Sequence, residues 1–359
     1  MTQTALLPEV LDALSDPVIL VDGRKVVTFG NAAAKEAWPS LVKGTPLSFT
    51  LRAPDLIDAI ERVLAGIAPI ARGTMTERLP VERLFDFQVV NLLSATGASP
   101  RTAPAIVLVF RDLTEAKRLE AMRVDFVANA SHELRTPLAS LLGFIETLQG
   151  PARNDPQAQS RFLDIMRAQG RRMARLIDDL LSLSRVEMSE HRRPVDSVDF
   201  CLVIRQVADT LRPVAEERHV SMVLDLPSQP IMVSGDRDEL MRIAENLIEN
   251  AIKYGQSGQR VDLTLTKAAT GLARGDEAHF TVRDYGPGIS AEHLPRLTER
   301  FYRVDASASR ETGGTGLGLA IVKHIINRHR GRLAIESELG AGSVFQVFLP
   351  LVETETPPG

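Results

Sequence analysis

The sequence predicts a multidomain protein: an α+β domain, then two long antiparallel helices, then an α/β domain. Three observations lead to this prediction. At 359 residues the chain is too long for one ordinary domain. Short strand-like and helix-like segments over 10–110 give way to a long helical repeat from Leu113. A polar segment, EMSEHRRPVD, then separates this repeat from strands and helices over about 195–352.

The composition excludes several classes of protein. It is 44% hydrophobic and 25% charged, as in ordinary globular proteins, and the net charge of -4 argues against nucleic-acid binding. The single cysteine, Cys201, excludes an intrachain disulfide or a cysteine zinc site and is expected to be buried. No apolar run approaches the ~18 residues that cross a bilayer, and no signal peptide is predicted. The chain is therefore expected to be soluble and cytoplasmic, with membrane association only through a segment absent from it.

The first region has the signals of an α+β domain. Two strands, Pro17 to Val21 and Lys25 to Phe29, are predicted to form a hairpin around the Asp22-Gly23 turn. The other elements predicted here are a helix at 53–67 and strands at 84–92 and 105–111.

The middle region predicts two long helices. Apolar residues at spacings of 4, 3, 4 and 3 form a seam on the first helix: Leu134, Leu138, Leu141, Ile145 and Leu148. Asp155 is a suitable N-cap for the second helix, which starts at Pro156 and runs to about Met188. Its apolar stripe comprises Phe162, Ile165, Met173, Leu176, Leu180 and Leu183. Two helices with one seam each cannot bury both seams alone, so a dimeric four-helix bundle is predicted.

One histidine in the octapeptide SHELRTPL, residues 131–138, is a candidate nucleophile. His132 lies about 180° around the helix from the seam residue Leu141, so it is predicted to face solvent. Glu133 can orient the imidazole ring and accept its proton, and Thr136 lies one turn later on the same face. Pro137 is expected to bend the helix beside the histidine. A lone surface histidine is usually inert, so a reactive partner is required.

Four segments of the third region could supply that partner. Asn246 and Asn250 share one helix face with Glu249 and Lys253, and their amide oxygens suit magnesium. The other segments are DYGPGI at 284–289, RFYR at 300–303 and GGTGLGLAI at 313–321. The last presents backbone N–H groups and a helix N-terminus to phosphate, although it is neither a Walker A loop nor a dinucleotide fingerprint. Each segment alone also fits a polar helix face, a glycine turn or a surface loop.

Taken in order and at these spacings, the segments resemble the conserved boxes of two-component sensor histidine kinases. SHELRTPL resembles the H box and ENLIENAIKY the N box, while DYGPGI, RFYR and GGTGLGLAI resemble the G1, F and G2 boxes. The resemblance covers about 115–350. Across DFVANASHELRTPLASLLGFIETL the chain is most similar to the phosphate-regulon sensor kinases.

The resemblance implies a Bergerat-type ATP-binding α/β sandwich with ATP and Mg²⁺ as cofactors. Asp284 would bind the adenine amine, Tyr254 would lie against the base, Lys253 would reach phosphate, and Asn250 would ligate magnesium with support from Asn246. Residues 300–313 would form a lid over ATP. The full implied nucleotide site is Asn246, Asn250, Lys253, Tyr254, Asp284, Gly286, Gly288, Phe301, Arg303, Gly314, Thr315, Gly316, Leu317 and Gly318.

The resemblance also implies roles for the H box. His132 would take the γ-phosphoryl group, with Glu133 as base, and pass it to an aspartate of a response regulator receiver domain. Thr136 matches the position used in dephosphorylating the regulator. Two alternatives share part of these features. A GHKL-type ATPase leaves the exposed His-Glu-x-x-Thr unexplained, and a regulator-binding scaffold leaves the intact nucleotide site unexplained.

The first region resembles a PAS sensor domain, in LDALSDPVILVDGRKVVTFGNAAAKE and FRDLTEAKRLE. It contains no histidine or cysteine, which disfavours histidine-ligated haem and excludes a cysteinyl-flavin adduct, so an interaction or dimerisation module is expected. The predicted domains are a PAS-like sensor at 1–112, a dimerisation and phosphotransfer hairpin at 113–190, a catalytic ATP-binding domain at 191–352 and a disordered tail at 353–359.

Overall fold

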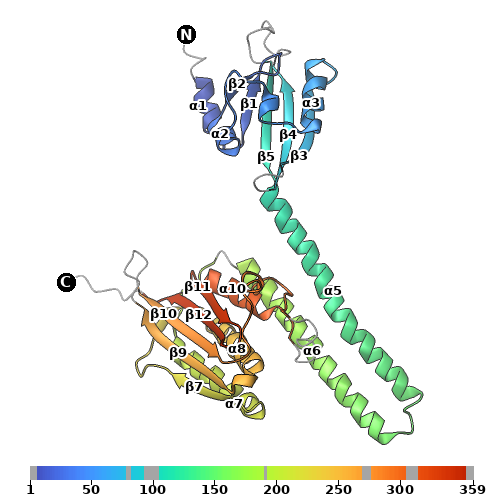
Figure 1. Cartoon of the computed structure of the whole chain (residues 1–359), viewed down its shortest axis with the longest axis vertical. Helices are drawn as coiled ribbons and strands as arrows, with labels where there is room; N and C mark the ends of the chain where they lie inside the picture. Colours follow the sequence, from blue (N-terminus) through green and yellow to red (C-terminus); the bar gives the residue numbers. More distant parts are fainter. Residues whose placement is uncertain are drawn as a thin grey trace, which may run out of the picture. The chain divides into compact units, whose positions relative to one another are not determined.

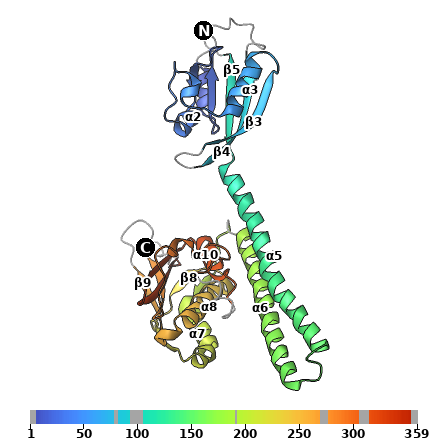
Figure 2. The ribbon, with the colours of Figure 1, turned by 45° about the vertical axis from the view of Figure 1, so that its right-hand side comes forward.

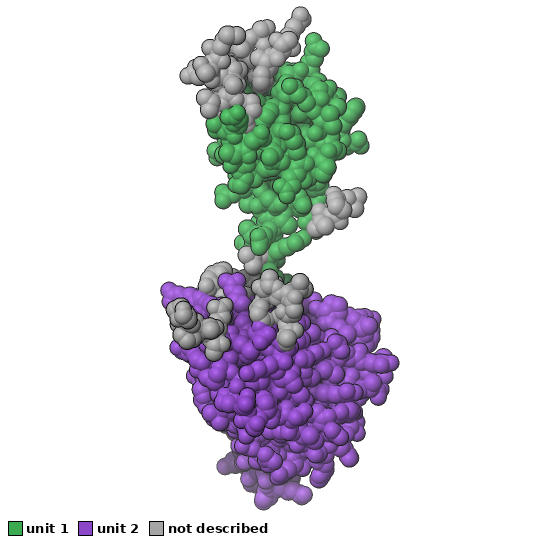
Figure 3. Space-filling view, turned by 90° about the vertical axis from the view of Figure 1, so that its left-hand side faces the viewer, with its two compact units in different colours: residues 1–125 green, residues 126–359 purple. Residues whose placement is uncertain are grey.

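The computed structural model describes residues 6–77, 82–92, 105–189, 192–268, 276–304 and 314–352. The predicted tail at 353–359 and most of the predicted lid, 305–313, lie outside these described residues. The chain divides into two compact units, 1–125 and 126–359 (Figure 3).

The first unit is built on a five-stranded antiparallel sheet in the order β2-β1-β5-β4-β3 (Figure 1). Its strands are β1 (Val18–Val21), β2 (Val27–Gly30), β3 (Ile70–Glu77), β4 (Arg83–Asn91) and β5 (Ile106–Asp112). The α-helices of the unit are α1 (Leu6–Asp12), α2 (Ala32–Ala37) and α3 (Pro54–Leu64), with a 3₁₀ turn, η1 (Leu47–Phe49). The predicted α+β composition of this region is therefore present.

Aromatic side chains fill the centre of the first unit. The Trp38 ring lies 5.1 Å from that of Phe85 and 4.9 Å from that of Phe110, measured between centroids. Asn31 is fully buried, and its side-chain oxygen accepts from the Val18 and Ala34 N–H groups, both at 2.9 Å. This amide caps α2 and ties it to β1, which satisfies polar groups that burial would otherwise leave unpaired.

The predicted elements of the first unit are found with shifted ends. The β1–β2 hairpin and strands β4 and β5 are present. Helix α3 ends at Leu64 rather than at Ile67, because Gly66 adopts a φ of +72°, which a helix cannot include. Strand β3 was not predicted: Gly73 interrupts its pattern and lies under the Phe87 ring, where a Cβ would collide.

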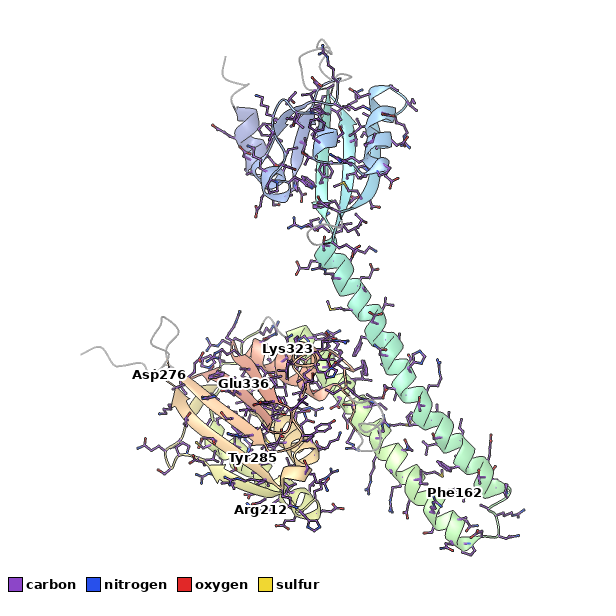
Figure 4. All side chains as sticks on the ribbon, viewed as in Figure 1. Phe162, Arg212, Asp276, Tyr285, Lys323 and Glu336 are labelled. Atoms are coloured by element: carbon purple, nitrogen blue, oxygen red, sulfur yellow. The ribbon has the colours of Figure 1, made fainter. Side chains whose placement is uncertain are left out.

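Two long helices follow, α5 (Thr114–Gln149) and α6 (Pro156–Ser189), forming a hairpin (Figure 2). The Asp155 carboxylate accepts from the N–H groups of Gln157 and Ala158 at 3.1 and 3.0 Å, which confirms the predicted N-cap. Helix α5 continues through Pro137 as one helix. Phe162, near the turn end of the hairpin in Figure 4, has its ring centroid 5.3 Å from that of Phe144.

The α/β region has a five-stranded sheet in the order β11-β12-β10-β9-β7, in which only β7 and β9 pair in parallel. Its strands are β7 (Ser221–Asp225), β9 (Arg260–Ala268), β10 (Glu277–Asp284), β11 (Arg332–Glu338) and β12 (Gly342–Pro350). Strands β6 (Ser197–Asp199) and β8 (Met232–Ser234) form a separate pair. Helices α7 (Phe200–Glu217), α8 (Arg237–Tyr254) and α10 (Gly318–Arg328) pack on the same side of the main sheet (Figure 1). Short 3₁₀ turns are η2 (Gln256–Gly258) and η3 (Leu294–Arg296).

The core of this α/β region includes part of α6. Leu176, Leu183 and Val186 are buried in the same cluster as the apolar residues of α8 and α10. The prediction that assigned Leu176 and Leu183 to a seam between hairpin helices is therefore corrected, because these two side chains pack against the α/β region. A hydrophobic stripe marks a buried face and does not say which surface covers it.

None of the helices in the described part of the chain is both long and apolar enough to span a membrane.

Candidate functional site

A pocket of about 540 Å³ opens between α8, the end of β10 and the start of α10, and one side of it is formed by α6. This volume falls in the range of small-molecule sites. Predicted site residues that line it are Asn246, Asn250, Lys253, Tyr254, Asp284, Gly288, Arg303, Gly314, Thr315, Gly316 and Gly318. The structure therefore brings together residues from all four sequence segments.

Asp284 ends β10 at the base of the pocket. Its side chain is buried and accepts from the Gly286 N–H at 2.9 Å and the Ser343 N–H at 3.3 Å. Burial raises the pKa of this carboxyl, and the two backbone N–H groups oppose the rise. The carboxylate is thus fixed in orientation, with capacity to accept from a ligand amine. Gly288, with a φ of +73°, closes the turn in a conformation that favours glycine.

One face of α8 forms the wall of the pocket. The helix begins because Asp236 accepts from the N–H groups of Asp238 and Glu239 at 3.0 and 3.2 Å. Asn246 and Asn250 follow on the same face, four residues apart. At the end of this face, the Lys253 ammonium lies 4.7 Å from the centroid of the Tyr254 ring, which is half-exposed.

The glycine-rich segment before α10 lies opposite α8. The Phe301 N–H donates to the Gly316 carbonyl at 2.8 Å, and Gly316 has a φ of +73°. Gly318, at the first turn of α10, lies so close to the Asn246 side-chain oxygen that a Cβ would collide with it. Because glycine has no Cβ, the start of α10 lies against Asn246 in the pocket wall, where the helix N–H groups suit a phosphate.

Three predicted nucleotide-site residues do not line the pocket. Leu317 is fully buried in the core beneath it, and Gly286 supports Asp284 through its N–H group. Phe301 packs its ring against Phe126 of α5, with centroids 5.9 Å apart. Direct contact between these three residues and a nucleotide remains a prediction.

The octapeptide on α5 lies beside this region. His132 is exposed, as predicted from its place opposite the seam, and it is not among the residues that line the pocket. Thr136 is also exposed, and its hydroxyl donates to the His132 carbonyl at 3.3 Å. Glu133 is half-buried and accepts from Arg172 at 3.1 Å and from Arg303 at 2.9 Å. Arg303 also donates to the Thr315 carbonyl at 3.0 Å, so one guanidinium joins Glu133 to the pocket.

Sequence reasoning missed the contribution of α6 and of α8 residues outside the predicted site, among them Arg242 and Glu245. Arg175, Asp178 and Asp179 of α6 line the pocket, as does Arg242 of α8. Arg242 lies four residues before Asn246 on the same helix face, and that spacing could have identified it. No sequence signal could have identified the three α6 residues, because they reach the pocket only through tertiary packing.

The pocket offers oxygen ligands for a divalent cation. The Asn246 amide nitrogen donates to the Arg242 carbonyl at 2.8 Å, which directs the amide oxygen toward Gly318. Asn250 lines the pocket one turn on. Hard oxygen ligands of this kind suit Mg²⁺. Among the described residues there is no group of three or more His, Cys, Asp or Glu side chains that could hold a metal. A cation here would therefore depend on amide and phosphate oxygens.

The fold and site define a nucleotide-binding α/β domain joined to a helical hairpin that carries an exposed histidine. Comparisons with known families agree. Residues 122–189 match the His Kinase A (phospho-acceptor) domain, and residues 235–353 match the histidine kinase-, DNA gyrase B- and HSP90-like ATPase. The chain belongs to the two-component sensor histidine kinases.

Three relatives show the extent of the similarity. The phosphate regulon sensor protein PhoR of Pseudomonas aeruginosa is 39% identical over 239 residues, covering 67% of this chain and 52% of the relative. The sensor-like histidine kinase SenX3 of Mycolicibacterium smegmatis is 38% identical, covering 68% and 62%. The sensor protein kinase WalK of Staphylococcus saprophyticus is 35% identical, covering 68% and 39%. The chain thus spans less than two thirds of each relative's length.

Proposed function

We propose that this protein is an ATP-dependent protein-histidine kinase that phosphorylates itself on His132. The observation that carries the proposal is the position of Arg303. This residue lines the nucleotide pocket and donates to Glu133, the neighbour of His132, at 2.9 Å. The phosphoacceptor segment and the pocket therefore meet within one compact unit.

The proposed reaction is a phosphoryl transfer. An imidazole nitrogen of His132 bonds to the γ-phosphorus of ATP, the bond from that phosphorus to the β–γ bridging oxygen breaks, and ADP leaves. Glu133 accepts the imidazole proton. Asp284 accepts from the adenine amine, and Lys253 neutralises phosphate charge. Catalysis of this kind depends mainly on positioning and charge neutralisation.

Asn250, supported by Asn246, would hold Mg²⁺, which supplies further charge neutralisation at the phosphates when bound. In the structure Glu133 is engaged by Arg172 and Arg303. Transfer therefore requires Glu133 to exchange at least one arginine for the imidazole N–H. A moving nucleotide-binding domain is a natural point of control over this step.

Labelling with γ-³²P-ATP and Mg²⁺ tests the proposal. We expect protein-bound label that is acid-labile and alkali-stable, absent in His132→Gln and retained in His219→Asn, a change at an exposed histidine outside the hairpin. Release of free phosphate without protein label would instead support a GHKL-type ATPase. A protein that binds no nucleotide would leave only the scaffold alternative.

We further propose that a response regulator receives the phosphoryl group on an aspartate and that Thr136 takes part in dephosphorylating the regulator, in which water hydrolyses the aspartyl phosphate and phosphate leaves. The exposed hydroxyl of Thr136, one turn from His132, supports this assignment. The similarity to a phosphate regulon sensor protein supports phosphate-regulon signalling as the narrower proposal. Because ATP and receiver domains are cytoplasmic, we place the reaction in the cytoplasm.

Exposed apolar side chains on the hairpin support a homodimer with a four-helix bundle. Large apolar residues of the hairpin with more than a third of their surface exposed include Leu138, Leu142, Ile145, Leu163, Ile177 and Leu181. A patch of this kind on two adjacent helices favours coverage by another protein surface, and a second hairpin is the simplest one.

For the first unit we propose a PAS-like sensor domain that works through protein contacts. Its centre is filled by Trp38, Phe85 and Phe110, whose rings contact one another. Such packing favours an interaction or dimerisation module over a cofactor-binding one.

A further inference from the structure

Asp179 of α6 reaches into the nucleotide pocket and pairs with residues that belong to the opposite wall. One carboxylate oxygen accepts from the Arg242 guanidinium at 2.8 Å, and the other accepts from the Thr315 hydroxyl at 2.8 Å. Its side chain is 19% exposed. All three residues line the pocket, and Asp179 is the partner that comes from the hairpin.

The two partners of Asp179 form a set of donors that suits phosphate. Arg242 presents a guanidinium, which recognises phosphate and carboxylate oxygens with the same geometry. Thr315 lies in the glycine-rich segment at the start of α10, and its hydroxyl oxygen accepts from the Leu317 N–H at 3.3 Å. The Asp179 carboxylate, held between these two donors, occupies the position expected for a phosphate at a helix N-terminus.

The contact is a costly one for α6 to make. Burial raises the pKa of the Asp179 carboxyl, and the Thr315 hydrogen bond and the Arg242 charge only partly oppose that rise. Removing a carboxylate from water costs free energy that one ion pair often fails to recover. A contact of this kind gives little net stabilisation and can be displaced by a stronger anion.

We propose that Asp179 occupies the terminal-phosphate subsite of the pocket, so that α6 and the phosphates of a nucleoside triphosphate compete for Arg242 and Thr315. This inference rests on the proposed function, because it takes the pocket to bind ATP. Without nucleotide, Asp179 holds the α/β region against α6. The triphosphate displaces Asp179 and weakens the attachment of that region to the hairpin, which frees it to present ATP to His132.

Calorimetric titration of the full chain tests the competition, with AMP-PNP and adenosine as probes. We expect Asp179→Asn to tighten AMP-PNP binding about tenfold, equivalent to about 1.4 kcal/mol. The same substitution should change the affinity for adenosine, which lacks phosphates, by less than about twofold. Asp164→Asn is the matched control: it removes the same charge from an exposed carboxylate of α6 that does not line the pocket, and it should leave AMP-PNP affinity within about threefold.

Each outcome of the titration decides the inference. Unchanged AMP-PNP affinity in Asp179→Asn, equal tightening in Asp164→Asn, or equal tightening for adenosine would each overturn it. If the parent chain labels His132 while Asp179→Asn has no effect, only the inference fails. If the parent chain binds no AMP-PNP, the proposed function fails as well.

A second measurement uses the parent chain alone, so it tests the proposed displacement even if Asp179→Asn folds poorly. Hydrogen exchange of the parent chain should become faster over residues 176–186 of α6 when AMP-PNP is added, because Leu176, Leu183 and Val186 lose their cover. Adenosine should leave exchange in this segment unchanged. An unchanged rate with AMP-PNP at saturation would overturn the proposed displacement.

Discussion

At the scale of single residues, the site depends on a few side chains held by neighbours far away in the sequence. Glu133 and Asp179 are carboxylates of the hairpin, and each is engaged by an arginine of the α/β region, Arg303 and Arg242 respectively. Both acids point to the same principle. The hairpin thus places carboxylates against arginines that line the pocket, which is the basis of the competition with an anionic ligand proposed above.

The first residue-scale prediction concerns Thr136. Its hydroxyl is exposed and bonds only within its own helix among the described contacts, so Thr136→Ala should alter the free energy of unfolding by less than about 0.5 kcal/mol. We expect regulator dephosphorylation to fall by about tenfold or more, because the hydroxyl proposed to take part in that hydrolysis is removed. Labelling of His132 should change less than about twofold, and both rates are measured with purified phosphorylated regulator.

Thr147→Ala is the matched control for this change. The Thr147 hydroxyl makes the same kind of bond, to the Gly143 carbonyl at 2.8 Å, but lies near the turn of the hairpin. It should leave both rates unaltered. Loss of His132 labelling in Thr136→Ala would contradict the division of roles between the two residues.

At the scale of elements, the two long helices and four of the five strands of the first unit were predicted, and one strand was missed. The ends of α6 follow from the Asp155 cap and the Pro156 start, both of which act within one turn. Strand β3 was missed because its burial depends on the Phe87 ring from the neighbouring strand, a contact that no local pattern records. The start of α8 is held by another long-range contact, from a buried histidine at the end of α10.

His329 is fully buried, and its Nε2 accepts from the Asp236 N–H at 3.1 Å while its Nδ1 donates to the Ile325 carbonyl at 2.8 Å. Burial lowers the pKa of His329, so the native state holds the neutral ring. The unfolded chain therefore binds the proton first as pH falls. This contribution to stability is complete above the ordinary histidine pKa and is lost below it.

We predict that the free energy of unfolding falls between pH 7 and pH 5.5, with a slope of up to about 1.4 kcal/mol per pH unit from this one histidine. Nearby Glu239, which is paired with Arg328, has the opposite effect on stability. Burial raises its pKa, so the native state binds this proton more readily than the unfolded chain as pH falls. Urea unfolding of His329→Gln at several pH values measures how much of the pH dependence of the free energy of unfolding comes from this histidine. The variant should show a shallower slope, whereas His219→Asn should retain the parent slope. Equal slopes in parent and His329→Gln would refute the assignment.

At the scale of the whole molecule, the hairpin has two apolar surfaces, one buried against the α/β region and one exposed. The end of α6 nearest the α/β region buries Leu176 and Leu183 there, while Ile145 and Leu138 of α5 remain exposed. The exposed seam is where a second copy is proposed to pack.

The whole-molecule prediction is that Ile145→Glu weakens dimerisation at least about hundredfold, because each protomer would place a charge in the buried seam of the bundle. Sedimentation equilibrium measures the dissociation constant, and circular dichroism checks that the helices persist. Leu202→Glu is the control, since Leu202 is an exposed leucine of α7 outside the hairpin. A dimer that survives Ile145→Glu unchanged would remove the proposed bundle.

Some features of this protein follow from its sequence, and others are visible only in the tertiary structure. The sequence by itself determined the long helices, the exposure of His132 and the four segments that meet in the pocket, because caps, periodicity and glycine-rich turns act over a few residues. Only the tertiary structure decided that Asp179, Arg175 and Arg242 share the pocket and that α6 divides its apolar stripe between two surfaces. Such contacts join residues distant in sequence, and their partners are set by packing, which no local pattern encodes.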